Sequence, residues 1–192
     1  GNNTASTGTL SVTGTNLTFT ASDNGTTTTL TNISDTTGLN FTISAKGNIA
    51  VGTIAVGSGS VNLNTAAFKA ANTATSITAI NGSSLITAGS LSLASNTFTN
   101  AAIGTSSQAL KTNVSSLTLT TGSGGAYISN AATLSTGILT SGGALSVTTT
   151  AGDLTLNGAT TWGSASALTL DAAGKLASNG IILASGGATG SI

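Results

Sequence analysis

The sequence predicts an all-β fold, a right-handed parallel β-helix (solenoid) of about eight coils, with three short strands in each coil of ~22 to 30 residues. The first observation behind this prediction is an apolar-x-apolar pattern in a Thr, Ser and Asn setting that returns seven times. The second is its spacing, since the steps between copies are 22, 22, 30, 26, 28 and 23 residues, within the range of stacked repeats. The copies lie at 17–19, 39–41, 61–63, 91–93, 117–119, 145–147 and 168–170.

Each leading segment alternates apolar and polar residues, which is the period of a β-strand. A second short strand between turn residues follows three of these segments, at 47–52, 152–158 and 174–180. A third apolar segment then closes those coils at 54–56, at Trp162 and at 181–183. In a parallel β-helix each strand pairs with its equivalent one coil away at about 4.8 Å, so about eight coils would span on the order of 40 Å.

We expect residues 1–192 to form a single β-helical rod segment, in which the coils over 61–145 are longer and less regular. Extra-long turns or a small protruding element are expected in that region. We also expect the rod to be a fragment of a longer repeat protein, because end coils expose apolar strand edges unless further coils or caps cover them. The candidate inward residues of the irregular coils are Phe68, Ile77, Ile80, Phe98, Ile103, Leu110 and Tyr127.

The composition excludes most functional chemistry. The chain contains 26 Gly and has no Cys, His, Met, Pro, Glu or Arg, and its four Asp and four Lys residues give a net charge of zero. We therefore predict no catalytic, cofactor-binding or metal-binding residues and no enzyme activity. Nucleic-acid binding requires clustered cations, and four scattered lysines do not supply them. No run approaches the ~18 apolar residues of a membrane-spanning helix.

Carboxylate chemistry and sugar stacking, both known for β-helices, have few candidate residues in this chain. Asp153 and Asp171 lie in adjacent predicted coils, but hydrolysis by two carboxylates needs them about 5 to 10 Å apart with suitable partners, so we expect solvated turn residues. Trp162 and Tyr127 are aromatic residues that could stack on sugars, and Trp162 is predicted to be core.

An ice-binding face would require a near-perfect lattice of outward Thr. The two expected outward columns are mixed: Thr18, Asn40, Asn62, Ser92, Thr118, Ser146 and Thr169, and Thr20, Thr42, Asn64, Ala94, Thr120, Thr148 and Asp171.

Three segments resemble the rod repeats of filamentous-haemagglutinin-like exoproteins, which are large bacterial adhesins secreted by the two-partner route. They are 47–54, 103–114 and 152–158, which read GNIAVGTI, IGTSSQALKTNV and GDLTLNG. The resemblance implies a right-handed β-helical shaft outside the cell that holds a binding region away from the surface or joins a matrix. We recognise no counterpart of the family's amino-terminal secretion domain in the 192 residues.

The leading functional hypothesis is a structural and interaction role, as the extracellular shaft of a secreted bacterial adhesin or matrix protein at the cell surface. The implied partners are neighbouring coils or copies of the same protein, and host or matrix glycans or proteins. The alternative is a self-assembling extracellular filament, since a neutral chain with uncapped ends has little to oppose stacking. A carbohydrate-active or ice-binding β-helix is the third hypothesis.

Overall fold

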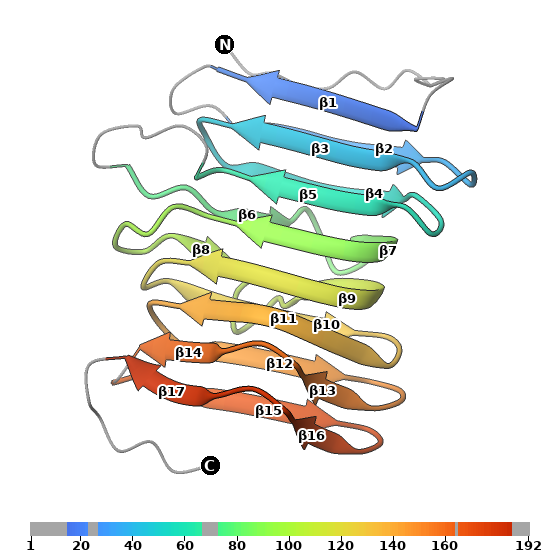
Figure 1. Cartoon of the computed structure of the whole chain (residues 1–192). Helices are drawn as coiled ribbons and strands as arrows, with labels where there is room; N and C mark the ends of the chain where they lie inside the picture. Colours follow the sequence, from blue (N-terminus) through green and yellow to red (C-terminus); the bar gives the residue numbers. More distant parts are fainter. Residues whose placement is uncertain (1–14, 23–26, 67–72, 164, 186–192) are drawn as a thin grey trace.

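The computed structural model describes residues 15–22, 27–66, 73–163 and 165–185, which form an all-β solenoid of about seven coils (Figure 1). Every strand pairing among these residues is parallel. In Figure 1 the nearer strands run from right to left and the strands behind them from left to right as the chain descends, which is a right-handed path. The predicted fold class is confirmed, with about seven coils in place of about eight.

The first half of the solenoid consists of β1, which precedes the coils, and of coils 1 to 4, which each contribute two strands. Their bounds are β1 (Asn16–Ala21); β2 (Thr28–Ser34) and β3 (Asn40–Ala45); β4 (Ile49–Ala55) and β5 (Ser60–Asn64); β6 (Ile77–Ala79) and β7 (Leu85–Ala94); β8 (Ala102–Ile103) and β9 (Leu110–Thr121).

The second half consists of coil 5, with two strands, and of coils 6 and 7, with three each. Their bounds are β10 (Gly125–Asn130) and β11 (Leu134–Ser141); β12 (Leu145–Thr149), β13 (Leu154–Leu156) and β14 (Thr160–Gly163); β15 (Leu168–Ala172), β16 (Leu176–Ser178) and β17 (Ile182–Ser185).

Each coil contributes to three columns of paired strands. The first column contains the starts of β2, β4, β10, β12 and β15 together with β6 and β8. The second contains the ends of β2, β4, β10, β12 and β15 and the starts of β7 and β9. The third contains β1, β3, β5, the ends of β7 and β9, then β11, and finally β13 with β14 and β16 with β17. Coils 6 and 7 therefore have the predicted three short strands, but in every coil one strand passes through two columns.

The core is built from inward side chains that stack on their equivalents in the next coil. Strict alternation along each strand places one apolar residue in two on the inside. Because one coil cannot bury these residues alone, the neighbouring coils complete the core. One such row in the third column consists of buried Phe41, Val61, Leu91 and Leu117.

The predicted register of the leading segments is wrong in two places. Leu17 pairs with Phe41 and not with Leu39, and Phe41 pairs with Val61, so the second copy of the pattern begins two residues later than predicted. Leu145 and Leu168 lie in the first column, whereas the five earlier segments lie in the third. The sequence could not distinguish the first column from the third, because both carry the same apolar-x-apolar pattern. It could not detect the displacement either, because a shift by two residues keeps every side chain on the same face of the strand.

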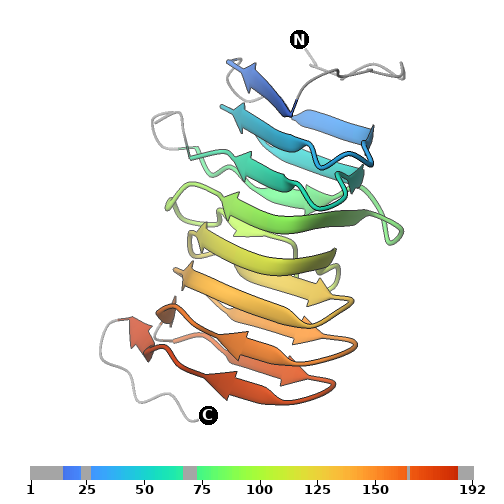
Figure 2. The same cartoon turned by 45° about the vertical axis from the view of Figure 1, so that its right-hand side comes forward.

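Long loops occur in coils 3 and 4 of the described chain. The segments 80–84 and 104–109 separate the first column from the second, and 95–101 follows the third column. Figure 2 shows these middle coils stacked continuously with those on either side. Of the candidate inward residues, Ile77, Ile103 and Leu110 are buried, Ile80 and Phe98 are exposed because they lie in loops, Tyr127 points outward, and Phe68 lies outside the described residues.

Candidate functional site

The two acidic residues considered for hydrolysis lie on different columns. Asp153 precedes β13 of the third column, and its Oδ1 accepts a hydrogen bond of 2.8 Å from the backbone N–H of Lys175 one coil later. Asp171 lies in β15, where it pairs with Thr148 of the second column and is exposed. Within the described ranges, no group of three or more His, Cys, Asp and Glu residues could hold a metal ion. The arrangement of Asp153 stabilises a turn and is not that of a paired-carboxylate site.

Asp35 organises a turn that the sequence pattern alone did not single out. Its Oδ2 accepts hydrogen bonds from the backbone N–H groups of Thr37 at 3.0 Å and Leu39 at 2.9 Å. The Thr37 hydroxyl also donates to the same carboxylate. Desolvation acts to raise the pKa of Asp35, and these hydrogen bonds act to lower it. Their combined effect is larger than that of desolvation, so the pKa lies below its ordinary value. The Asp-x-Thr spacing is typical of a side-chain turn.

Polar side chains connect successive coils on the outer face of the third column. Asn40 donates from Nδ2 to Asn16 Oδ1 at 3.1 Å, and the Ser60 hydroxyl donates to Asn40 Oδ1 at 2.8 Å. Asn179 donates to Asn157 Oδ1 at 2.8 Å in the same manner near the other end. These ladders follow the axis of the solenoid, so they favour neighbouring coils in register.

The outward rows of this face differ from the predicted ones but remain mixed in residue type. They therefore do not form the near-perfect Thr lattice that an ice-binding face requires. The corrected rows are Thr18, Thr42, Asn62, Ser92 and Thr118, and Thr20, Ser44, Asn64, Ala94, Thr120, Thr140 and Thr161.

The two aromatic residues considered for sugar stacking have different environments. Trp162 is buried, with 5% of its surface exposed, and its Nε1 donates to the Ser166 carbonyl at 3.1 Å. The prediction that it belongs to the core is confirmed. Tyr127 is half-buried on the outer face of β10 and pairs with Ser146 of the next coil.

Exposed apolar side chains gather on the outer face of coils 5 to 7. Ile138, Ile181 and Leu183 are 60%, 65% and 55% exposed. Thr160 pairs with Leu139 on one side and with Ile182 on the other. Because Ile138 and Ile181 immediately precede these two partners, they lie in one row along the axis. Leu183 lies beside them, next to Thr161. Alternation could not identify this patch, because it begins at the irregularity between Thr136 and Leu139.

No protein-family model, curated protein or solved structure matches the chain. The part of the chain that the structure describes contains no helix that is long and apolar enough to cross a membrane. The physical properties of the surface are therefore the basis for a functional proposal: uncharged polar ladders, a few exposed apolar residues and a half-buried tyrosine.

Proposed function

We propose that this chain is an extracellular β-helical shaft of a large secreted bacterial adhesin or matrix protein, and that it is not catalytic. One observation carries the proposal. The described strands pair in parallel with their equivalents in neighbouring coils, so each added coil lengthens the solenoid by one strand spacing, about 4.8 Å. In such an architecture the length of the solenoid grows with the number of residues, and a shaft requires this property.

The outer surface supports the same proposal. The outward residues of β3, β5 and the end of β7 are Asn, Thr, Ser and Ala, and no charge repeats along the axis there. Because like charges stacked at strand spacing would repel one another, a neutral surface suits a long shaft. The resemblance of 47–54, 103–114 and 152–158 to filamentous-haemagglutinin-like rod repeats is the basis for proposing a secreted adhesin among the possible β-solenoids.

Immunogold labelling tests the proposed location and role. Antibodies raised against the purified chain should label the outside of intact cells that carry the gene, and their Fab fragments should reduce attachment of those cells to surfaces. A matched strain in which the gene is deleted should show neither effect. Labelling confined to the cytoplasm, or unchanged attachment in the deletion strain, would contradict the proposal.

A second function, as a subunit of a self-assembling filament, is favoured by the last described coil. Leu176 pairs with buried Leu154 on one side, yet it is itself 48% exposed. Strands β15 to β17 pair with coil 6, and their other edges have no partner among the described residues. Electron micrographs of the purified chain separate the two functions, because fibres favour the filament and monodisperse short rods favour the shaft.

A further inference from the structure

Tyr127 lies directly below a protruding loop. In the first column Ala126 pairs with Ile103 of the preceding coil, and in the second column Ile128 pairs with Leu110. Tyr127 alone therefore occupies, in coil 5, the place that coil 4 fills with the six residues 104–109. The loop must leave the sheet at the row of Tyr127.

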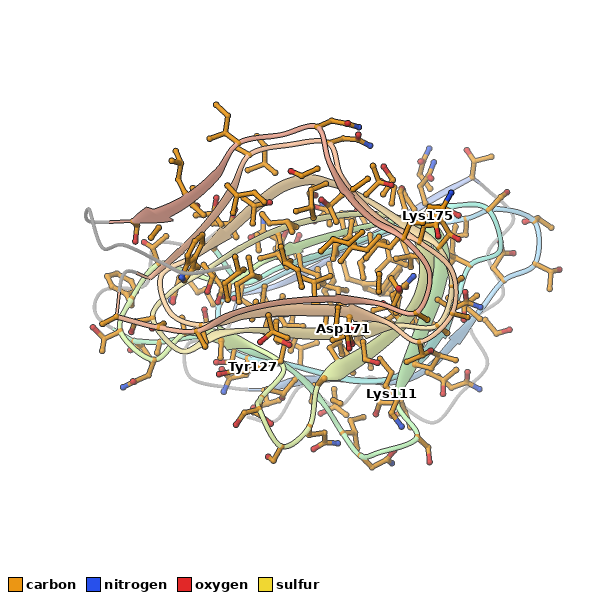
Figure 3. The ribbon with its side chains drawn as sticks, turned by 90° about the horizontal axis from the view of Figure 1, so that it is seen from below. Lys111, Tyr127, Asp171 and Lys175 are labelled. Atoms are coloured by element: carbon orange, nitrogen blue, oxygen red, sulfur yellow. The ribbon has the colours of Figure 1, made fainter. Side chains whose placement is uncertain are left out.

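A second loop, 80–84, leaves coil 3 at the same junction between columns. The Nζ of Lys111 donates a hydrogen bond to the Gly82 carbonyl, which connects β9 to this loop. Loop 104–109 is closed by hydrogen bonds in both directions between the backbones of Thr105 and Gln108, at 2.9 and 3.1 Å. We call residues 80–84 and 104–109 the loop wall. Figure 3 shows green and yellow-green loops projecting beyond the last coils on the side of Lys111, Tyr127 and Asp171.

Below the loop wall, coils 5 to 7 present an uninterrupted surface. Strands β10, β12 and β15 pass through the first and second columns without a loop between them. Their outward side chains form two adjacent rows, which we call the floor. The rows are Tyr127, Ser146 and Thr169, and Ser129, Thr148 and Asp171.

Two glycines lie next to Tyr127, Gly125 beside its ring and Gly104 against its backbone carbonyl. A side-chain carbon at Gly125 would lie 3.3 Å from Tyr127 Cε2, so the ring leans along the strand over Gly125. Above it stands Gly104, whose φ of 64° suits the sharp departure of the loop. Since Tyr127 is half-buried, part of this residue remains exposed to a ligand.

We propose that the floor and the loop wall bind a neutral glycan chain, with the Tyr127 ring stacked on the apolar C–H face of one sugar. An aromatic ring offers apolar area together with a hydroxyl group, and Ser146, Thr148 and Thr169 both donate and accept hydrogen bonds as sugar hydroxyls do. The ammonium of Lys111 is engaged by Gly82, and the one carboxylate, Asp171, lies at the far edge of the floor. This charge distribution gives an acidic polymer no cationic partner on the floor. A shaft needs no such ligand, so the inference stands apart from the proposed function.

The single tyrosine of the chain provides the readout. Protein with isotope-labelled tyrosine should give one set of ring resonances in NMR spectra, which reports on Tyr127 alone. The probes are cellohexaose, maltohexaose, mannohexaose and chitohexaose, with polygalacturonate as an acidic comparison. At least one neutral hexasaccharide should shift the resonances saturably, with a Kd on the order of 1 mM or tighter. The proposal is overturned if none does, or if only polygalacturonate does; neither result affects the shaft proposal.

Variants then locate the site, with binding measured by calorimetry. Tyr127→Phe should retain binding, whereas Tyr127→Ala should weaken it about tenfold. Ser146→Gln places a larger side chain on the floor and should also block the ligand. The matched control is Ser92→Gln, because Ser92 is likewise a half-buried outward serine, between Asn62 and Thr118 on the opposite face. If Ser146→Gln binds as the natural chain does, or if Ser92→Gln loses binding equally while both melt like the natural chain, the assignment is wrong.

Discussion

The Thr112 hydroxyl donates a hydrogen bond of 2.8 Å to Oδ1 of Asn130, its paired neighbour one coil later, and both side chains are fully buried. The same Oδ1 accepts the backbone N–H of Val114 at 3.0 Å. Nδ2 donates to the carbonyls of Val114 at 3.0 Å and Ala132 at 2.8 Å. Four hydrogen bonds thus satisfy this buried amide, and three of them join coil 4 to coil 5.

Asn130→Ala should be strongly destabilising. It leaves the buried Thr112 hydroxyl and the Val114 backbone N–H without this acceptor, and such groups are costly to leave unpaired. We expect a loss of about 3 kcal/mol, seen as a melting temperature lower by roughly 6 to 12 °C. Circular dichroism during heating measures it. The control is Asn157→Ala, which removes two exposed coil-to-coil hydrogen bonds, one to Ser135 and one from Asn179, and should cost less than about 1 kcal/mol. Equal effects of the two substitutions would contradict this account.

The sequence predicted the fold through side-chain alternation, and the limits of that pattern explain what it missed. Leu91 and Leu93 are buried as the pattern requires. The register could not be predicted, because Leu145 in the first column and Val147 in the second repeat the spacing of Leu117 and Leu119 in the third. Apolar spacing identifies the inside of a coil, but which side of the coil a strand occupies depends on the lengths of the loops between strands.

The candidate surface was predicted less well than the fold. Tyr127 was expected to point inward, although its neighbours Ala126 and Ile128 alternate with it and are both buried. Alternation along 126–128 therefore predicts an outward Tyr127, whereas the apolar character of its ring favours an inward position. The buried position of Asn130 follows from the same alternation, since it lies two residues after Ile128, but a general preference for apolar cores argued against it.

Gly158→Ala should destabilise the corner between β13 and β14. A side-chain carbon at Gly158 would lie 2.4 Å from the carbonyl carbon of Gly137 in the coil above, so the backbone would have to move. We expect a cost of about 2 to 3 kcal/mol from this overpacking, measured by urea denaturation. Gly82→Ala is the matched control, since nothing lies within 4 Å of its added carbon, and it should change stability by less than about 1 kcal/mol. Comparable losses at both glycines would refute the steric explanation.

Asp35 should make stability depend on pH in the acidic range. Hydrogen bonds from Thr37 and Leu39 hold its pKa below the ordinary 3.8 in the folded chain. Because the folded pKa is the lower one, the stabilisation is present above the ordinary pKa and is lost as the pH falls through the folded pKa. Asp35→Asn should therefore reduce the dependence of the melting temperature on pH below about pH 4. The control, Asp171→Asn, lies in a strand without this turn. A carboxyl titration by NMR that finds the Asp35 pKa at or above 3.8 would contradict the prediction.

Leu154 and Leu176 form a pair that compares the inside of the solenoid with its last described coil. They are the same residue type, paired in one row, but Leu154 is fully buried and Leu176 is 48% exposed. Leu154→Ala should cost about 3 kcal/mol and Leu176→Ala less than half of that, because truncating a side chain costs more the more deeply it is buried. The two stability costs are first compared in dilute protein, at concentrations where electron micrographs show single rods. If the cost of Leu176→Ala rises toward that of Leu154→Ala as the protein concentration increases, another copy covers the last coil and the filament is favoured over the isolated shaft. A cost that stays small at every concentration would count against end-to-end stacking at this coil.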